Sequence, residues 1–144
     1  MNQNNNKTIR IAIDAMGGDF APKSEVEGAI LAYKNKPKDW DIELILVGDE
    51  KKIKTVLEQT DTGGMKYSIV HADEVITMKD DPVVAFKTKK NSSLYLGAEL
   101  HSQGKADAFV SAGNTGAMLS ISTMLLGRVK GVSRPSIGAL LPTS

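Results

Sequence analysis

The sequence contains no cysteine. This absence excludes disulfide bonds, thiolate metal ligands and thiol nucleophiles, and it suits a reducing compartment such as the cytoplasm. An excess of charge of one sign is also lacking, because 18 Lys and Arg side chains stand against 17 Asp and Glu, for a formal net charge of +1. A nearly neutral chain has no overall field that attracts nucleic acid or a membrane surface, so any recognition of an anion must be local.

Long hydrophobic runs are missing too. The most apolar stretch, residues 118–126, is interrupted by Ser120, Ser122 and Thr123, and it is far shorter than the roughly 20 residues of a membrane-spanning helix. It therefore predicts a buried helix. Residues 1–7 form an Asn-rich polar tail without the features of a signal peptide or an anchor, so we expect a disordered tail, no export and a cytoplasmic protein.

Three common catalytic or nucleotide-binding motifs are absent. The pair Gly17-Gly18 is followed by Asp19 and does not continue as G-x-G-x-x-G, and no G-x-x-x-x-G-K-[ST] occurs. These absences argue against dinucleotide binding and against a P-loop. Ser111 lacks the G-x-S-x-G turn, which makes it a poor candidate for a hydrolase nucleophile.

The pattern that is present alternates strands with helices. Strands are predicted at residues 8–14, 42–47, 67–71, 107–111 and 137–141, and helical periodicity follows each of the first four, with two helices between the third and fourth strands. Strands that are apolar on both faces and separated by helices indicate parallel crossovers. We predict an α/β fold with three layers and an open, mainly parallel sheet.

In such a sheet, ligands bind outside the carboxyl ends of the strands. The loops at residues 14–19, 71–81 and 111–116 should therefore converge at one edge. The first contains Asp14 and the paired Gly17 and Gly18, whose backbone could approach an anion closely. The alternative is a glycine turn of positive φ, with Asp19 capping the following helix.

The third loop, Ser111-Ala112-Gly113-Asn114-Thr115-Gly116, places hydroxyl, amide and backbone donors at the start of a helix. Such an arrangement suits a phosphate or an oxyanion. The alternative is that Asn114 or Thr115 is an ordinary helix cap.

Two histidines are present. His71 could form a triad with Asp73, Glu74 and Ser111, although nothing in the sequence fixes their distances, and a polar residue at a strand end is the simpler interpretation. If His71 is catalytic, its titration range suits protonation of a leaving thiolate or a hydrogen bond to phosphate. His101 is predicted to be a structural residue of a helix.

Charged clusters offer further candidates. Lys87, Lys89 and Lys90 could contact a phosphate or an acidic partner, and Arg134, held by the following proline, could clamp an anion. Ordinary solvated surface is the alternative for both. Asp80-Asp81 could suggest a divalent metal, but a helix cap is the better interpretation because no further oxygen ligands match, so we predict no metal.

Taken together, the chain resembles the bacterial acyl-carrier-protein:phosphate acyltransferase family of phospholipid synthesis. The resemblance is carried by four segments in order: IAIDAMGGDFAPKSEVEGA, HADEVITMKDDPVVAFKTKKNSSL, GKADAFVSAGNTGAML and KGVSRPSIGALLPT. It implies a fold similar to phosphotransacetylases and to isocitrate and isopropylmalate dehydrogenases. It also implies transfer of a long-chain acyl group from acyl carrier protein to inorganic phosphate, with no cofactor.

The resemblance further implies a homodimer that associates peripherally with membranes and supplies a membrane acyltransferase. His71 and Lys87 would be catalytic. The implied substrate-binding residues are Asp14, Gly17, Gly18, Asp19, Asp81, Lys90, Ser93, Ser111, Gly113, Asn114, Thr115 and Gly116, to which we add Arg134 as a possible clamp.

Members of that family are much longer. Residues 8–144 would form the N-terminal part of the acyltransferase domain, and we expect this part to be inactive without the remainder. Two alternatives are a phosphotransacetylase-like enzyme that uses a small acyl-coenzyme A and a non-catalytic phosphate-binding module.

Overall fold

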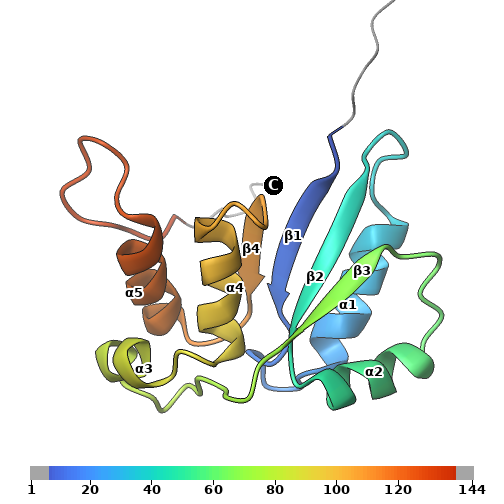
Figure 1. The fold of residues 1–144 in the computed structure, drawn as a ribbon, viewed down its shortest axis with the longest axis horizontal. Helices are drawn as coiled ribbons and strands as arrows, with labels where there is room; N and C mark the ends of the chain where they lie inside the picture. Colours follow the sequence, from blue (N-terminus) through green and yellow to red (C-terminus); the bar gives the residue numbers. More distant parts are fainter. Residues whose placement is uncertain (1–6, 139–144) are drawn as a thin grey trace, which may run out of the picture.

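The computed structural model describes residues 7–138 (Figure 1). The strands are β1 (Ile9–Asp14), β2 (Ile42–Gly48), β3 (Tyr67–His71) and β4 (Ala108–Ser111). The helices are α1 (Lys23–Lys34), α2 (Glu50–Glu58), α3 (Pro82–Thr88), α4 (Ser93–Ser102) and α5 (Thr115–Leu126). The first four predicted strands are present with bounds that differ by one residue at most, and helices follow each of them as predicted.

The four strands form one sheet in the order β3-β2-β1-β4, and all neighbouring pairs are parallel. In the register, Asp14 lies opposite Val47 on one side and Ser111 on the other. The predicted α/β class and parallel sheet are confirmed, whereas the likeness to the dehydrogenase fold stays a prediction. Of the fifth strand predicted at 137–141, Ile137 and Gly138 are in no regular element and the rest lies outside the described residues.

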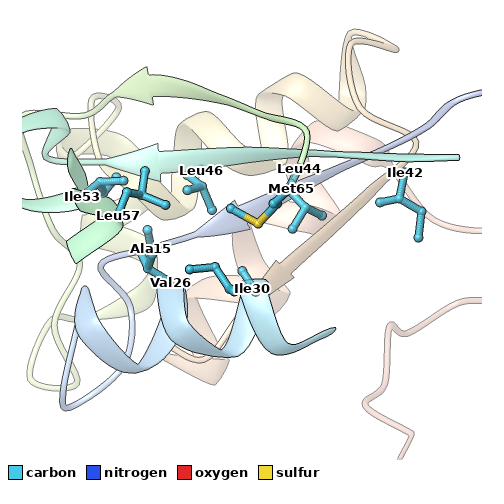
Figure 2. Close-up of a cluster of buried hydrophobic side chains, with 10 residues drawn as sticks. Ala15, Val26, Ile30, Ile42, Leu44, Leu46, Ile53, Leu57 and Met65 are labelled. Atoms are coloured by element: carbon cyan, nitrogen blue, oxygen red, sulfur yellow. The ribbon is translucent and has the colours of Figure 1, made fainter. Parts of the chain in front are cut away.

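One face of the sheet is covered by α1 and α2. Their apolar side chains pack on alternate residues of the two central strands, and Figure 2 shows this cluster between the helices and the sheet. Its buried members are Ala15, Val26, Ala29, Ile30, Ile42, Leu44, Leu46, Ile53, Leu57 and Met65. Alternation along β2 turns Ile45 and Val47 to the opposite face, as the two-residue period of a strand requires.

The opposite face is covered by α4, with α3 and α5 packed against it farther out (Figure 1). Ala98 of α4 is fully buried, and Gly97 faces the Phe109 ring so closely that an added Cβ would lie 2.2 Å from its Cε2 atom. The helices on both faces complete the predicted three layers. The starts of α4 and α5 both lie at the carboxyl edge of the sheet. The reason is that α4 leads from this edge back to the beginning of β4, and α5 follows the end of β4.

The caps explain where the helices begin. The side chains of Asp49, Asp81, Ser92 and Asn114 each accept a backbone hydrogen bond at the start of their helix, which satisfies amides that have no partner within the helix. None of the helices in the described part of the chain is long and apolar enough to cross a membrane. The predicted polar tail lies outside the described residues except for Lys7, whose ammonium pairs with Asp107 at 3.0 Å.

Candidate functional site

The loops after β1 and β4 meet at the carboxyl edge through a buried acid. The Asp14 carboxylate is 1% exposed. Its Oδ2 accepts a hydrogen bond from Ser111 Oγ at 2.8 Å, and its Oδ1 accepts one from the Met16 amide at 3.1 Å. Ser111 Oγ in turn accepts the Gly113 amide at 3.0 Å. Each Asp14 oxygen thus has a donor inside the protein, so this carboxylate holds the two loops together.

Gly17 and Gly113 allow the same loops to touch backbone to backbone. A Cβ added at Gly17 would lie 2.5 Å from Asp14 Oδ2 and 2.9 Å from the Gly113 nitrogen, and one added at Gly113 would lie 3.2 Å from the Gly17 Cα. Neither glycine has a positive φ. Gly18 has no positive φ either, so the alternative prediction of a positive-φ turn at Gly17-Gly18 is wrong. Gly17 and Gly113 are required by the close approach of the two loops instead.

The other residues of the first loop have simpler surroundings. Gly18 lies against the Glu25 carboxylate, which also accepts a hydrogen bond from Ser24 Oγ at 2.8 Å. Asp19 is exposed and precedes a helix that has no side-chain cap, so the predicted capping role of Asp19 is wrong. Because carboxylates flank this turn, its chemistry is less favourable to an anion than that of the loop after β4.

The start of α5 is the best-formed donor site at this edge. Asn114 is 8% exposed and caps the helix, with its Oδ1 accepting the Ala117 amide at 3.0 Å. The amides of Thr115 and Gly116 donate to no acceptor among the described residues. Free amides at the positive end of a helix dipole have the chemistry that suits an anion.

Asn114 also ties this helix to the loop before α3. Its Nδ2 donates to the carbonyl oxygens of Thr77 and Asp80, at 3.0 and 3.2 Å. Gly116 approaches α3 so closely that an added Cβ would lie 2.8 Å from Pro82 Cγ. The loops at 71–81 and 111–116 thus converge as predicted, and the contacts come from the later part of the loop at 71–81.

Lys89 secures that loop from the other side. Its ammonium donates to the Val75 carbonyl at 3.0 Å and to Asp80 Oδ2 at 2.8 Å. The Lys89 hydrogen bond, followed by that from the Thr77 amide, lowers the pKa of Asp80 to about 2. The sequence singled out Lys89 only as part of a lysine run, and no local signal reveals that it folds inward while its neighbours do not.

His71 lies away from this cluster. It ends β3, which is separated from β4 by two strands, a lateral distance of roughly 14 Å at the usual strand spacing. Its Nε2 lies 2.9 Å from Asp73 Oδ1, and its Nδ1 accepts the Glu50 amide at 3.2 Å. The structure therefore brings His71 to Asp73 but not to Ser111, which leaves no triad between them. His101 is a structural residue as predicted, with its Nδ1 3.0 Å from the Ala106 carbonyl oxygen.

The remaining candidates lie around α3 and the start of α4. Lys87 and Lys90 are exposed. Asp81 is the cap of α3, with its Oδ1 accepting the Val83 and Val84 amides at 3.0 and 2.9 Å, as the preferred interpretation predicted. Ser93 is 1% exposed and its hydroxyl has no hydrogen-bond partner among the described residues. Arg134 is exposed in the segment after α5.

Within residues 7–138, no group of three or more His, Cys, Asp or Glu side chains is arranged to hold a metal ion. The chemistry available is that of backbone amides, hydroxyls and lysines. Groups of these kinds can bind and orient an oxyanion without a covalent intermediate on the protein.

The fold and the site define a parallel three-layer α/β protein whose sheet has free backbone amides at its carboxyl edge. The sequence profile of the family described as "Fatty acid synthesis protein" matches residues 9–144. The chain therefore belongs to this family.

Several curated relatives carry the name phosphate acyltransferase. The protein of Desulforamulus reducens is 46% identical over 136 residues, which cover 94% of this chain and 39% of that protein. The protein of Streptococcus mutans is 48% identical over 134 residues (93% and 38%), and that of Chlorobaculum tepidum is 50% identical over 127 residues (88% and 38%). The chain thus spans about two fifths of the length of these relatives.

Proposed function

We propose that this chain forms part of a phosphate acyltransferase, which transfers a long-chain acyl group from the thioester of acyl carrier protein to inorganic phosphate. One observation carries the proposal. The start of α5 offers free amides beside the loops joined by Asp14 and Ser111, in a chain whose relatives are named for this activity. Phosphate is the acceptor that the relatives' name specifies, and an oxyanion is what this edge can hold.

The reaction needs no group from the protein to become acylated. An oxygen of bound hydrogen phosphate attacks the thioester carbonyl carbon, and a tetrahedral oxyanion forms. The carbon–sulfur bond then breaks, and the proton of hydrogen phosphate goes to the leaving thiolate, which gives acyl phosphate and the free thiol. Positioning of phosphate and stabilisation of negative charge supply the rate enhancement in such a mechanism.

The residues take different parts in this proposal. The Thr115 and Gly116 amides hold phosphate or the oxyanion, and the exposed ammonium groups of Lys87 and Lys90 supply positive charge. Asp14, Ser111, Gly17, Gly113 and Asn114 position the loops that present these donors. His71 is too far from this cluster to contact the same phosphate. If His71 assists the leaving thiolate, the carrier-bound end of the substrate must extend towards β3.

The proposed partners follow from the same activity. They are acyl carrier protein and inorganic phosphate, with a second copy of the protein and a membrane acyltransferase as further partners. We propose a cytoplasmic location with peripheral attachment to the membrane. No part of the proposal calls for a cofactor or for nucleic acid.

The test uses a chimera in which this chain replaces the matched N-terminal residues of the Streptococcus mutans relative. Chimera and isolated chain are each incubated with a long-chain acyl carrier protein and phosphate, and acyl phosphate is measured by mass spectrometry. We expect product from the chimera and none from the chain alone. A chimera that folds but forms no acyl phosphate contradicts the proposal.

Two variations of the assay address the alternatives. A chimera that prefers acetyl-coenzyme A to the long-chain substrate indicates a phosphotransacetylase-like enzyme. Binding of phosphate by the chain without transfer by the chimera indicates a phosphate-binding module.

A further inference from the structure

We propose that the groove between α3 and α5 binds the acyl chain of the substrate. The groove has a volume of about 330 Å³. On one side it is lined by Val83, Phe86 and Lys87 of α3, which recur at the three- and four-residue spacing of a single helix face. Leu119 and Met124 of α5 line the other side. The inference rests on the proposed function, because that function supplies the class of ligand.

The groove is continuous with the oxyanion-binding edge. Both of its walls begin there, since Gly116 in the first turn of α5 packs on Pro82, the first residue of α3. Met124 lies nine residues after Thr115, about 14 Å along the helix axis. Figure 1 shows α3 and α5 side by side. A chain held by its carbonyl near the start of α5 can therefore extend along the groove between them.

The lining is apolar where a hydrocarbon would lie. Val83 and Met124 are 56% and 65% exposed, a high fraction for side chains of this type. The hydroxyl of Thr123, which also lines the groove, donates to the Leu119 carbonyl at 2.7 Å and is thus satisfied within its own helix. Phe86 lies at the boundary with the buried core formed by α3, α4 and α5. An apolar ligand would gain by covering these side chains.

The groove also contains one positive charge that could pair with an anionic head group. Among residues 7–138, Lys87 is the only charged residue that lines the groove, and its side chain forms no ion pair with any of the others. An apolar channel with a single ammonium group suits an amphiphile with an anionic head, such as an acyl phosphate.

A second hollow fits this ligand less well. It has a volume of about 560 Å³ and lies between α1 and the sheet, where Val110 of β4 is 54% exposed. Asp14 and Glu25 line it, and no lysine or arginine does. Its only charged side chains would repel an anionic head group, so the groove between α3 and α5 is the better match.

The first test measures binding of octyl, decyl and dodecyl phosphate to the 144-residue chain by calorimetry, below the critical micelle concentrations. We expect the affinity to rise by about fourfold for each added methylene group. The Val83→Asp and Met124→Asp variants should weaken binding of dodecyl phosphate at least tenfold and flatten this dependence. Both positions are exposed, so neither substitution should disturb folding.

Two matched controls sharpen the result. Leu31 is 62% exposed on α1, and Leu31→Asp should leave the affinity unchanged. Lys87→Ala should weaken binding severalfold, whereas Lys51→Ala on α2 should not. A chain-length dependence that survives both groove variants, an equal loss in Leu31→Asp, or no binding of dodecyl phosphate to the folded chain would overturn the assignment.

The proposed acyl-chain groove and the proposed function can be disproved independently of each other. Acyl phosphate formation by the chimera that is unaffected by Val83→Asp and Met124→Asp overturns the groove alone. Binding of dodecyl phosphate that depends on the groove, together with a chimera that forms no acyl phosphate, overturns the function alone.

Discussion

Asp14 is the residue on which the carboxyl edge depends. A carboxylate that is 1% exposed requires donors, and it finds them in Ser111 and the Met16 amide. The sequence predicts both Asp14 and Ser111 as site residues, although they lie 97 positions apart in the chain. It could not predict that they bond to each other, because only the pairing of β1 with β4 brings them together.

Ser111→Ala tests this bond. The substitution leaves the buried Asp14 with one donor fewer and the Gly113 amide without its acceptor, so we expect a loss of about 1–3 kcal/mol in the free energy of unfolding. Urea denaturation measures it. Ser68, which is exposed on β3 and has no hydrogen bond through its side chain, is the control, and Ser68→Ala should change stability by less than about 0.5 kcal/mol. Equal effects of the two substitutions would contradict the role given to Asp14.

Gly17→Ala and Gly28→Ala should change the free energy of unfolding in opposite directions. The Cβ added at Gly17 would lie 2.5 Å from Asp14 Oδ2, and we expect a destabilisation of about 1–3 kcal/mol from overpacking. At Gly28, in the middle of α1, no heavy atom lies within 4 Å of the added Cβ. Alanine there should stabilise the protein by about 0.5–1 kcal/mol through helix propensity. Thermal unfolding of both variants checks the pair, and a neutral Gly17→Ala would contradict the close contact.

At the scale of elements, the helix starts were the most predictable features. Asp81, Ser92 and Asn114 are all cap residues by type, and each caps its helix. The cap at Asp81 is the preferred interpretation of the sequence, and the cap at Asn114 is one of the alternatives. What the sequence could not provide is the second task of Asn114, whose amide nitrogen bonds to carbonyls 34 and 37 residues earlier in the chain.

Because Asn114 makes these additional hydrogen bonds, its substitution should cost more stability than the substitution of Asp49, the cap of α2. Asn114→Ala removes the cap of α5 and two further hydrogen bonds, so we expect a loss of about 2–3 kcal/mol. Asp49→Ala removes the cap of α2 and a 3.9 Å ion pair with the exposed Lys52, and it should cost about 1 kcal/mol. Chemical denaturation gives both values. Hydrogen exchange should also show faster exchange of residues 75–81 in Asn114→Ala alone, and unchanged exchange there would argue against the tie between the loops.

The ion pair of Lys89 with Asp80 predicts a pH dependence. The folded-state pKa of Asp80 is about 2, below the ordinary value of 3.8. The resulting stabilisation is present above pH 4 and is lost as the pH falls from about 4 to 2. Asp107, whose pKa is also about 2 because of the Arg10 amide and Lys7, loses stabilisation in the same window. Lys89→Met should therefore make the decline in stability shallower without abolishing it, as unfolding midpoints at pH 5 and 2.5 would reveal. A decline of the same steepness in Lys89→Met would contradict the pairing.

At the scale of the whole molecule, the periodicity of the sequence predicts the fold class, since strands and helices alternate and the strands are apolar on both faces. The order β3-β2-β1-β4 does not follow from it. This order separates His71 from Ser111 and joins Ser111 to Asp14, so it decides which of the predicted site residues can act together. The groove between α3 and α5 is likewise a product of packing between helices that are distant in sequence.

The proposed function requires that this edge of the sheet delivers phosphate to an acyl thioester. The most direct measurement supplies the Streptococcus mutans chimera with long-chain acyl carrier protein and phosphate labelled with ¹⁸O at all four oxygens, and determines the mass of the product. We expect acyl phosphate that retains all four labels, because a phosphate oxygen attacks the carbonyl carbon. Release of unlabelled free fatty acid without any labelled acyl phosphate would contradict it.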